Sequence, residues 1–192
     1  IQPVFLERAL LAAGALLVLW IAWALQATGL PAPVKWAGQA VLLAGMLVGL
    51  YWHIVYQGFP YAPYAQMAGA LQAQVSSGDR VIHSNKLTLL PGMVYAPQLA
   101  QRFVADPPGS GSDTLAPETQ RVLDVAESAS IEAASAGTAP GDRVYLVIFE
   151  RAIAEYQNLG EPTHPHLAWL EIHFELIRQQ SWGELVVYEF IR

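Results

Sequence analysis

The sequence predicts a membrane-anchored α/β protein, with two transmembrane helices followed by a small α/β sandwich that has a largely parallel sheet of about four strands. Three observations lead to this prediction. Two long uncharged apolar stretches fill most of the first 56 residues, and almost all ionisable residues come after them. In that later part, short β-branched runs alternate with helical segments, a pattern typical of strands joined by crossover helices.

The two apolar stretches predict spans at about residues 9–27 and 36–56, within a membrane region covering 1–57. A helix that rises about 1.5 Å per residue needs roughly 20 apolar residues to cross a hydrocarbon core of about 30 Å. Ala9 to Val34 and Trp36 to Tyr56 are both long enough. Tryptophan and tyrosine lie mostly toward their ends, as interfacial aromatic rings do. A buried helical hairpin in a soluble protein is the less favoured alternative.

Residues 58–192 form the predicted soluble α/β domain. Six consecutive apolar residues, Val144 to Phe149, predict a central strand that is buried on both faces. The other expected strands are 80–83, 101–105 and 184–191. The expected helices are 64–74, 118–134 with a possible break near 128–130, and 165–179, besides a broken helix or turn over 87–99. In the last helix, the apolar positions at helical spacing are Leu167, Leu170, Phe174 and Ile177.

Two further segments have specific expectations. Asp106 to Ala116 consists mainly of turn-forming and small polar residues, which predicts a surface loop. Tyr61, Tyr64 and Met67 follow the second span closely, so we expect them to pack on the lipid headgroups or on other membrane helices.

The charge distribution excludes some functions. Eight basic and fifteen acidic residues after position 56 give a net charge of −7, so the domain lacks the basic surface that nucleic acids require. The chain has no cysteine, which removes disulfides, thiolate nucleophiles and zinc–thiolate sites. Membrane topology is not fixed by charge, because Arg8 and Lys35 flank opposite ends of the first span.

The candidate binding residues are His83, Ser84, Asn85 and Lys86, which follow the first expected strand. Ligands of open parallel sheets bind outside the carboxyl ends of the strands, which makes this segment the first place to look. A polar strand-to-helix loop without a ligand is the alternative. No residue is assigned a catalytic role, and no cofactor is expected.

Other polar clusters do not specify a reaction. His166 and His173 are seven residues apart, whereas helical metal ligands need a spacing of three or four, so no metal site is expected. His164 fits a helix N-terminus, where Thr163 could be the cap. Glu150 and Arg151 follow the central strand and either contact a ligand or form a solvated ion pair. A membrane-tethered hydrolase would need Ser84 with His83, but adjacent strand residues point to opposite faces.

Four segments of the soluble region resemble polytopic bacterial glycosyltransferases of the dolichyl-phosphate-mannose-protein mannosyltransferase type: 77–86, 90–95, 143–151 and 164–169. The resemblance implies a multi-pass cell-membrane enzyme that moves a sugar from a polyprenyl-phosphate donor to an acceptor outside the cytoplasm. This chain would be its C-terminal part, with an extracytoplasmic domain in an accessory or acceptor-binding role. The catalytic acid of that family lies in a loop that this chain does not contain, so no catalytic residue is carried over.

A second interpretation stays open, namely a stand-alone two-span membrane protein whose α/β domain binds a solute or a partner. The first interpretation implies three partners: the lipid bilayer, a lipid-linked sugar donor and an unknown acceptor. Because the sequence begins at Ile1 rather than at a methionine, we expect it to be a piece of a longer protein.

Overall fold

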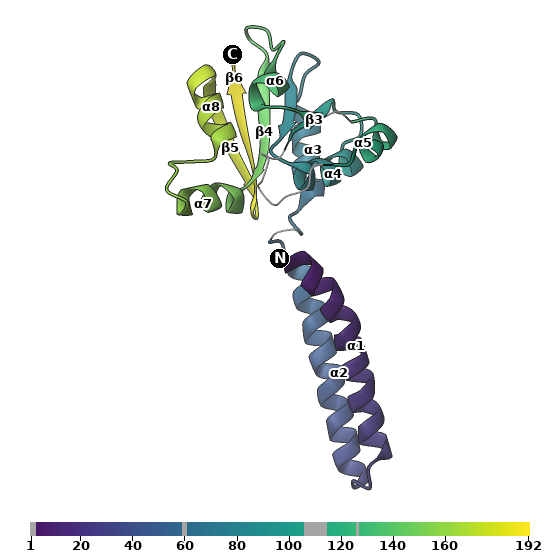
Figure 1. Ribbon diagram of the computed structural model, residues 1–192. Coiled ribbons are helices and arrows are strands. Elements are labelled where there is room, and N and C mark those ends of the chain that lie inside the picture. The colour runs from purple at the N-terminus through teal and green to yellow at the C-terminus, as the bar shows by residue number, and fades with distance from the viewer. Residues whose placement is uncertain (1–2, 59–60, 106–114, 126) are drawn as a thin grey trace. The chain divides into compact units, whose positions relative to one another are not determined.

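A computed structural model describes residues 3–58, 61–105, 115–125 and 127–192, with side chains in the first helix described from Gly14 onward (Figure 1). The chain divides into two compact units, residues 1–56 and 57–192. Most of the loop predicted for Asp106 to Ala116 lies outside the described residues.

The first unit is a pair of helices, α1 (Pro3–Ala27) and α2 (Ala32–Val55), joined by a short connection. Lys35 Nζ donates to the Gln26 carbonyl at 2.9 Å and so closes that connection. Gly38 lets the helices approach, because a Cβ there would lie 3.0 Å from Leu25 Cδ1. Among the described residues, α2 is long and apolar enough to cross a membrane, whereas the described apolar part of α1, Gly14–Ala27, is shorter.

The second unit is built on a mixed sheet of six strands in the order β3-β2-β1-β4-β6-β5. Four strands lie where the sequence predicts them: β1 (Arg80–His83), β2 (Gln101–Val104), β4 (Arg143–Phe149) and β6 (Leu185–Ile191). β3 (Glu127–Ser128) and β5 (Glu175–Trp182) are additional. The first four strands in this order pair in parallel, but β6 is antiparallel to both β4 and β5. The expectation of about four strands was therefore too low.

The helix expected over residues 165–179 is wrong in its second half. Helix α8 (Pro165–His173) ends where Phe174 takes an extended conformation, and the chain continues as β5. Gly183, with a φ of 61°, starts the two-residue turn into β6, a position that favours glycine. Ile177 lies on the exposed edge strand rather than on a buried helical face. Residues 175–182 therefore form a strand because they pair with β6, although their apolar residues have helical spacing.

The helix expected over residues 118–134 is divided into three elements. These are α5 (Pro117–Leu123), β3 and α6 (Ile131–Ser135). Asp124 ends α5 in the left-handed conformation, and the Ser130 side chain accepts a hydrogen bond from Ala133 N to begin α6. The two caps therefore interrupt the helix on both sides of β3.

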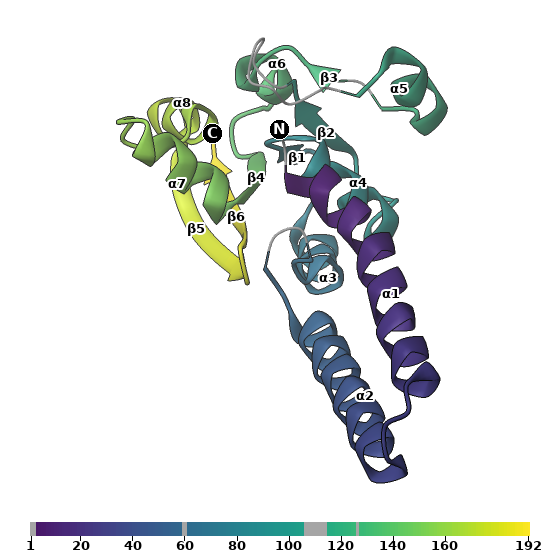
Figure 2. The same cartoon turned by 60° about the horizontal axis from the view of Figure 1, so that its bottom comes forward.

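Helices cover both faces of the sheet. Helices α3 (Tyr64–Gln74) and α4 (Lys86–Tyr95) lie on one face, while α6, α7 (Glu150–Asn158) and α8 lie on the other (Figure 2). Along β4, Leu146 packs toward α8 and Tyr145 toward α3, so the central strand is buried on both faces as predicted. Tyr64 and Met67 are buried in this core, so the expectation that they pack on lipid or membrane helices was wrong.

A buried carboxylate links the antiparallel strands. Glu189 on β6 is 3% exposed and accepts hydrogen bonds from Arg143 on β4 at 2.5 Å and from Arg178 on β5 at 2.6 Å. The Arg178 Nε also donates to Glu189, which makes this pair bidentate. The network favours the observed register of β5, because a shift by one residue would carry Arg178 to the other face.

Candidate functional site

The predicted binding segment lies at a topological switch point of the sheet. Parallel strands β1 and β4 are neighbours, and the chain leaves β1 for α4 on one face but leaves β4 for α7 on the other. In open α/β sheets, ligands bind at the carboxyl ends of two such neighbouring strands, where the connections leave on opposite faces. The structure therefore places residues 83–86 at the carboxyl end of β1, where the sequence predicts a binding segment.

His83 has a packing role in this structure. Its side chain is fully buried, and Nε2 donates to Gln101 Oε1 at 2.8 Å, while Gln101 Nε2 donates to the Ala96 carbonyl. Gly92 of α4 sits directly against this pair, because a Cβ there would lie 2.5 Å from Gln101 Oε1. Burial lowers the pKa of His83 to about 4, against a smaller opposing effect of the Gln101 hydrogen bond. At neutral pH the imidazole is uncharged.

The next three residues differ in what they can offer a ligand. Asn85 caps α4, since its Oδ1 accepts from Leu87 N at 3.0 Å and from Thr88 N at 3.2 Å. Ser84 N donates to Val147 O, but its buried hydroxyl has no hydrogen-bond partner among the described groups. Lys86 is half-buried in the first turn of α4. The structure thus gives His83 and Asn85 internal roles and leaves Ser84 and Lys86 as the better candidates for contact.

Ser84 and His83 do not form a nucleophile–base pair. Within the described structure, neither the Ser84 hydroxyl nor His83 Nδ1 has a hydrogen-bond partner. His83 lies on the face of α3 and α4, beside its register partner Val147. Successive strand residues face opposite ways, so this geometry does not support a hydrolase.

Two histidines lie at the start of α8, of which His164 is buried and His166 is partly buried. His164, rather than Thr163, is the cap, because its Nδ1 accepts from His166 N at 3.2 Å. Burial lowers the pKa of His164 to about 3, with a further contribution from His166, and lowers that of His166 to about 4. Across the described residues, no group of three His, Cys, Asp or Glu side chains is arranged to hold a metal ion.

Glu150 and Arg151 begin α7 after the central strand. Arg151 Nε forms an exposed ion pair with Glu155 at 3.2 Å, one helical turn onward. Glu150 N donates to the Glu184 carbonyl and joins the end of β4 to the start of β6. Arg151 therefore forms a solvated ion pair of small energetic value with Glu155.

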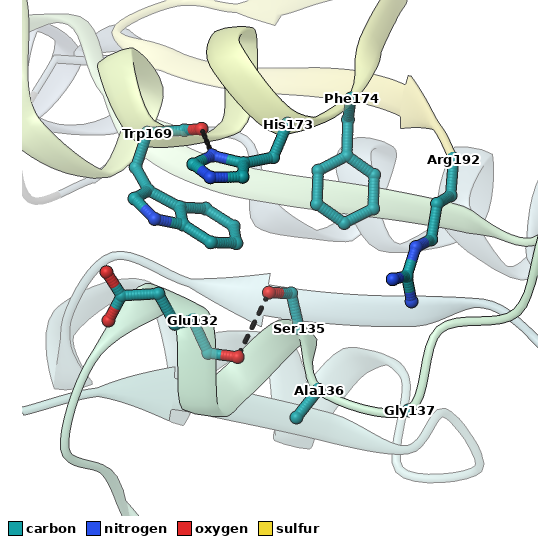
Figure 3. Close-up of a pocket in the computed structure, with 8 residues that line it drawn as sticks. All are labelled: Glu132, Ser135, Ala136, Gly137, Trp169, His173, Phe174 and Arg192. Carbon is teal, nitrogen blue, oxygen red and sulfur yellow. Dashed lines mark hydrogen bonds between the residues drawn. The ribbon is translucent and has the colours of Figure 1, made fainter.

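A pocket of about 320 Å³ lies at the opposite end of β4 from Ser84 (Figure 3). One side is formed by α6 and the segment after it, through Glu132, Ser135, Ala136 and Gly137. The other side is formed by the end of α8 and by the residue after β6, through Trp169, His173, Phe174 and Arg192. Its volume is near the lower end of the range for small-molecule sites, roughly 300–1,000 Å³.

The aromatic side of this pocket is held in place by its own contacts. The Trp169 and His173 rings stack with centroids 4.1 Å apart and an interplanar angle of 18°. His173 Nδ1 donates to the Trp169 carbonyl at 2.8 Å, since a carbonyl oxygen can only accept. On the α6 side, the Ser135 hydroxyl donates to the Ile131 carbonyl at 2.8 Å. The pocket is therefore preformed on the aromatic side, which reduces the entropy cost of binding.

The sequence does not predict this pocket. Trp169 and His173 are four residues apart on one helix, which is a local signal for stacking. Glu132 and Arg192 are sixty positions apart, and only the antiparallel return of β6 along β4 brings them to one site. That return was not predicted.

No family model matches this chain, and no curated protein matches it either. The function must therefore be inferred from the sequence pattern and from the geometry of the two sites described above.

Proposed function

We propose that this chain is the C-terminal part of a multi-pass membrane glycosyltransferase that uses a polyprenyl-phosphate-linked sugar. Its soluble unit lies outside the cytoplasm and has an accessory or acceptor-binding role. The observation that carries the proposal is α2, whose 24 residues include none that is buried in the described structure. An apolar helix that has no buried residue in the protein is stable in lipid, where its backbone groups are satisfied internally.

Two further features support this choice. Four segments of the soluble unit resemble the terminal domain of such transferases. The unit itself offers no reactive centre in residues 83–86, because His83 is neutral and buried and Asn85 caps a helix. The resemblance to those transferases implies that the catalytic carboxylate of the proposed enzyme lies upstream of this chain.

The proposal is tested by the size and activity of the native protein. An antibody raised against residues 62–192 should detect a membrane protein several times larger than 20.9 kDa. That protein, purified in detergent, should transfer sugar from a polyprenyl-phosphate donor, whereas the 192-residue chain alone should not. A native product of about 20.9 kDa, or transfer by the short chain, would contradict the proposal.

A charge placed in the middle of α2 should prevent membrane integration. Leu43 lies near the centre of this helix, and a central arginine costs roughly 2.5–3.5 kcal/mol in insertion experiments. We expect Leu43→Arg to move much of the chain into the carbonate-extractable fraction of expressing cells. The matched control is Leu30→Arg in the connection between the helices, which should stay in the membrane pellet. Equal integration of both variants would show that α2 is not a span.

The pocket under α8 favours the second function, a stand-alone two-span protein that binds a solute. Its aromatic side and its volume of about 320 Å³ suit a small molecule without any transferase chemistry. In this case the native membrane protein would migrate near 20.9 kDa and transfer no sugar. The immunoblot and transfer assay described above therefore separate the two functions.

A further inference from the structure

The pocket under α8 carries opposite charges at its two ends. Glu132 lies at one end below Trp169, and Arg192 lies at the other end beside Phe174 (Figure 3). The aromatic rings lie between these charges, opposite α6 and the residues that follow it (Figure 3). A molecule that fills this space therefore meets a carboxylate, an aromatic surface and a guanidinium in that order.

Trp169 is positioned to act as a flat platform. His173 covers one side of the indole, and the other side faces the α6 wall of the pocket (Figure 3). The face of an indole carries negative charge density, so it attracts polarised C–H groups. One face of a pyranose ring presents several such groups, which makes a sugar ring a suitable partner for this surface.

The charged ends suit the other parts of a phosphorylated sugar. A carboxylate only accepts hydrogen bonds, and the hydroxyls of a sugar supply donors for Glu132. The Arg192 side chain donates through Nη1 to the Thr138 carbonyl, and this hydrogen bond holds the guanidinium at its end of the pocket. A fixed guanidinium binds phosphate through parallel charge-assisted hydrogen bonds.

We infer that this pocket binds a monosaccharide that carries a phosphate. The ring lies against Trp169, its hydroxyls donate to Glu132, and the phosphate pairs with Arg192. The choice of a sugar rests on the proposed function, whereas the order of charges and the aromatic platform come from the pocket itself. A ligand that is only cationic is disfavoured, because Arg192 would repel it.

The test is calorimetric titration of the full 192-residue chain in nanodiscs. The probes are mannose 1-phosphate, glucose 1-phosphate, unphosphorylated mannose, inorganic phosphate and phosphocholine. We expect at least one hexose 1-phosphate to bind more tightly than mannose, phosphate or phosphocholine. Arg192→Gln should weaken that binding by about tenfold, the effect of losing one hydrogen bond between charged groups. It should not change the binding of unphosphorylated mannose.

Matched variants separate this site from general charge effects. Glu132→Gln should weaken both the hexose 1-phosphate and mannose, while Arg192→Lys should retain part of the phosphate affinity. Glu161→Gln and Arg102→Gln change exposed residues outside the pocket and should bind like the unmodified chain. Retained circular dichroism of each variant checks the fold. Absence of hexose 1-phosphate binding, unchanged binding in Arg192→Gln and Glu132→Gln, or tighter binding of phosphocholine would overturn the inference.

Failure of this inference is distinguishable from failure of the proposed function. Titration measures binding to the short chain, whereas the proposed function is judged by native mass and by transfer from the parent protein. A short-chain polyprenyl-phosphate mannose added to the nanodiscs identifies the source of the ligand. Competition with the hexose 1-phosphate assigns the pocket to the lipid-linked donor, and lack of competition assigns it to a free sugar phosphate.

Discussion

Acidification from pH 7 to pH 4 is expected to remove several kcal/mol from the stability of the soluble unit. Burial lowers the pKa of His83 and His166 to about 4 and that of His164 to about 3. In the unfolded chain each histidine titrates near pH 6.5. Between pH 6.5 and pH 4 the unfolded state therefore binds protons that the folded state does not bind. The free energy of unfolding falls by up to about 1.4 kcal/mol per pH unit for each histidine.

Urea unfolding of residues 57–192 at a series of pH values measures this effect. Trp169 and Trp182 are the only tryptophans in this unit and report its unfolding by fluorescence. The informative variant is His164→Asn, because asparagine keeps a cap acceptor for α8 and cannot take up the proton. We expect a shallower pH dependence for it than for His173→Asn, which changes an exposed histidine. Equal slopes for the two variants would show that buried His164 does not cause the acid sensitivity.

Leu146→Ala is expected to cost about 2–5 kcal/mol, the range for truncating a buried leucine. Leu146 is fully buried on β4 and packs in the core between the sheet and helices α6 to α8. Domains of this kind are stable by only about 5–15 kcal/mol, so the variant would lose a large share of its stability. The lost stability has two parts: the transfer free energy of the removed side-chain atoms and the cost of the cavity that they leave.

The matched control uses the same substitution at an exposed position. Leu159 is 80% exposed at the end of α7, and Leu159→Ala should stay within about 0.5 kcal/mol of the unmodified protein. Urea midpoints of both variants, measured at pH 7.5 to keep the histidines neutral, give the comparison. A loss below about 1 kcal/mol for Leu146→Ala would mean that β4 is not at the centre of a tightly packed core.

Local sequence signals were sufficient where one strand or cap determines the structure. The apolar run Val144 to Phe149 predicted a strand buried on both faces, and that strand is confirmed. The strand β5 was missed because Phe174 and Ile177 continue a helical spacing by coincidence. Its conformation depends on pairing with β6, which is a non-local interaction that periodicity cannot show.

The same distinction applies to the sites. Residues 83–86 could be placed at a carboxyl edge from the order of elements alone, but the internal hydrogen bond of His83 to Gln101 could not be foreseen. The partner lies eighteen positions away, on another strand. The pocket could not be predicted from the sequence, because Glu132, Trp169 and Arg192 become neighbours only after the sheet has formed. Amino-acid composition does not show which distant residues the fold brings together.

The order of strands also affects the biosynthesis of this domain. β6 lies inside the sheet, between β4 and β5, although it follows both of these strands in the sequence. The ribosome needs roughly 2–8 s to add the residues from the end of β4 to the end of β6 at typical rates of synthesis. During that time β4 lacks one neighbour and presents an apolar edge to its surroundings. We therefore expect the sheet to close only after synthesis of residues 185–191, so that chaperones have a period in which they can bind the open edge.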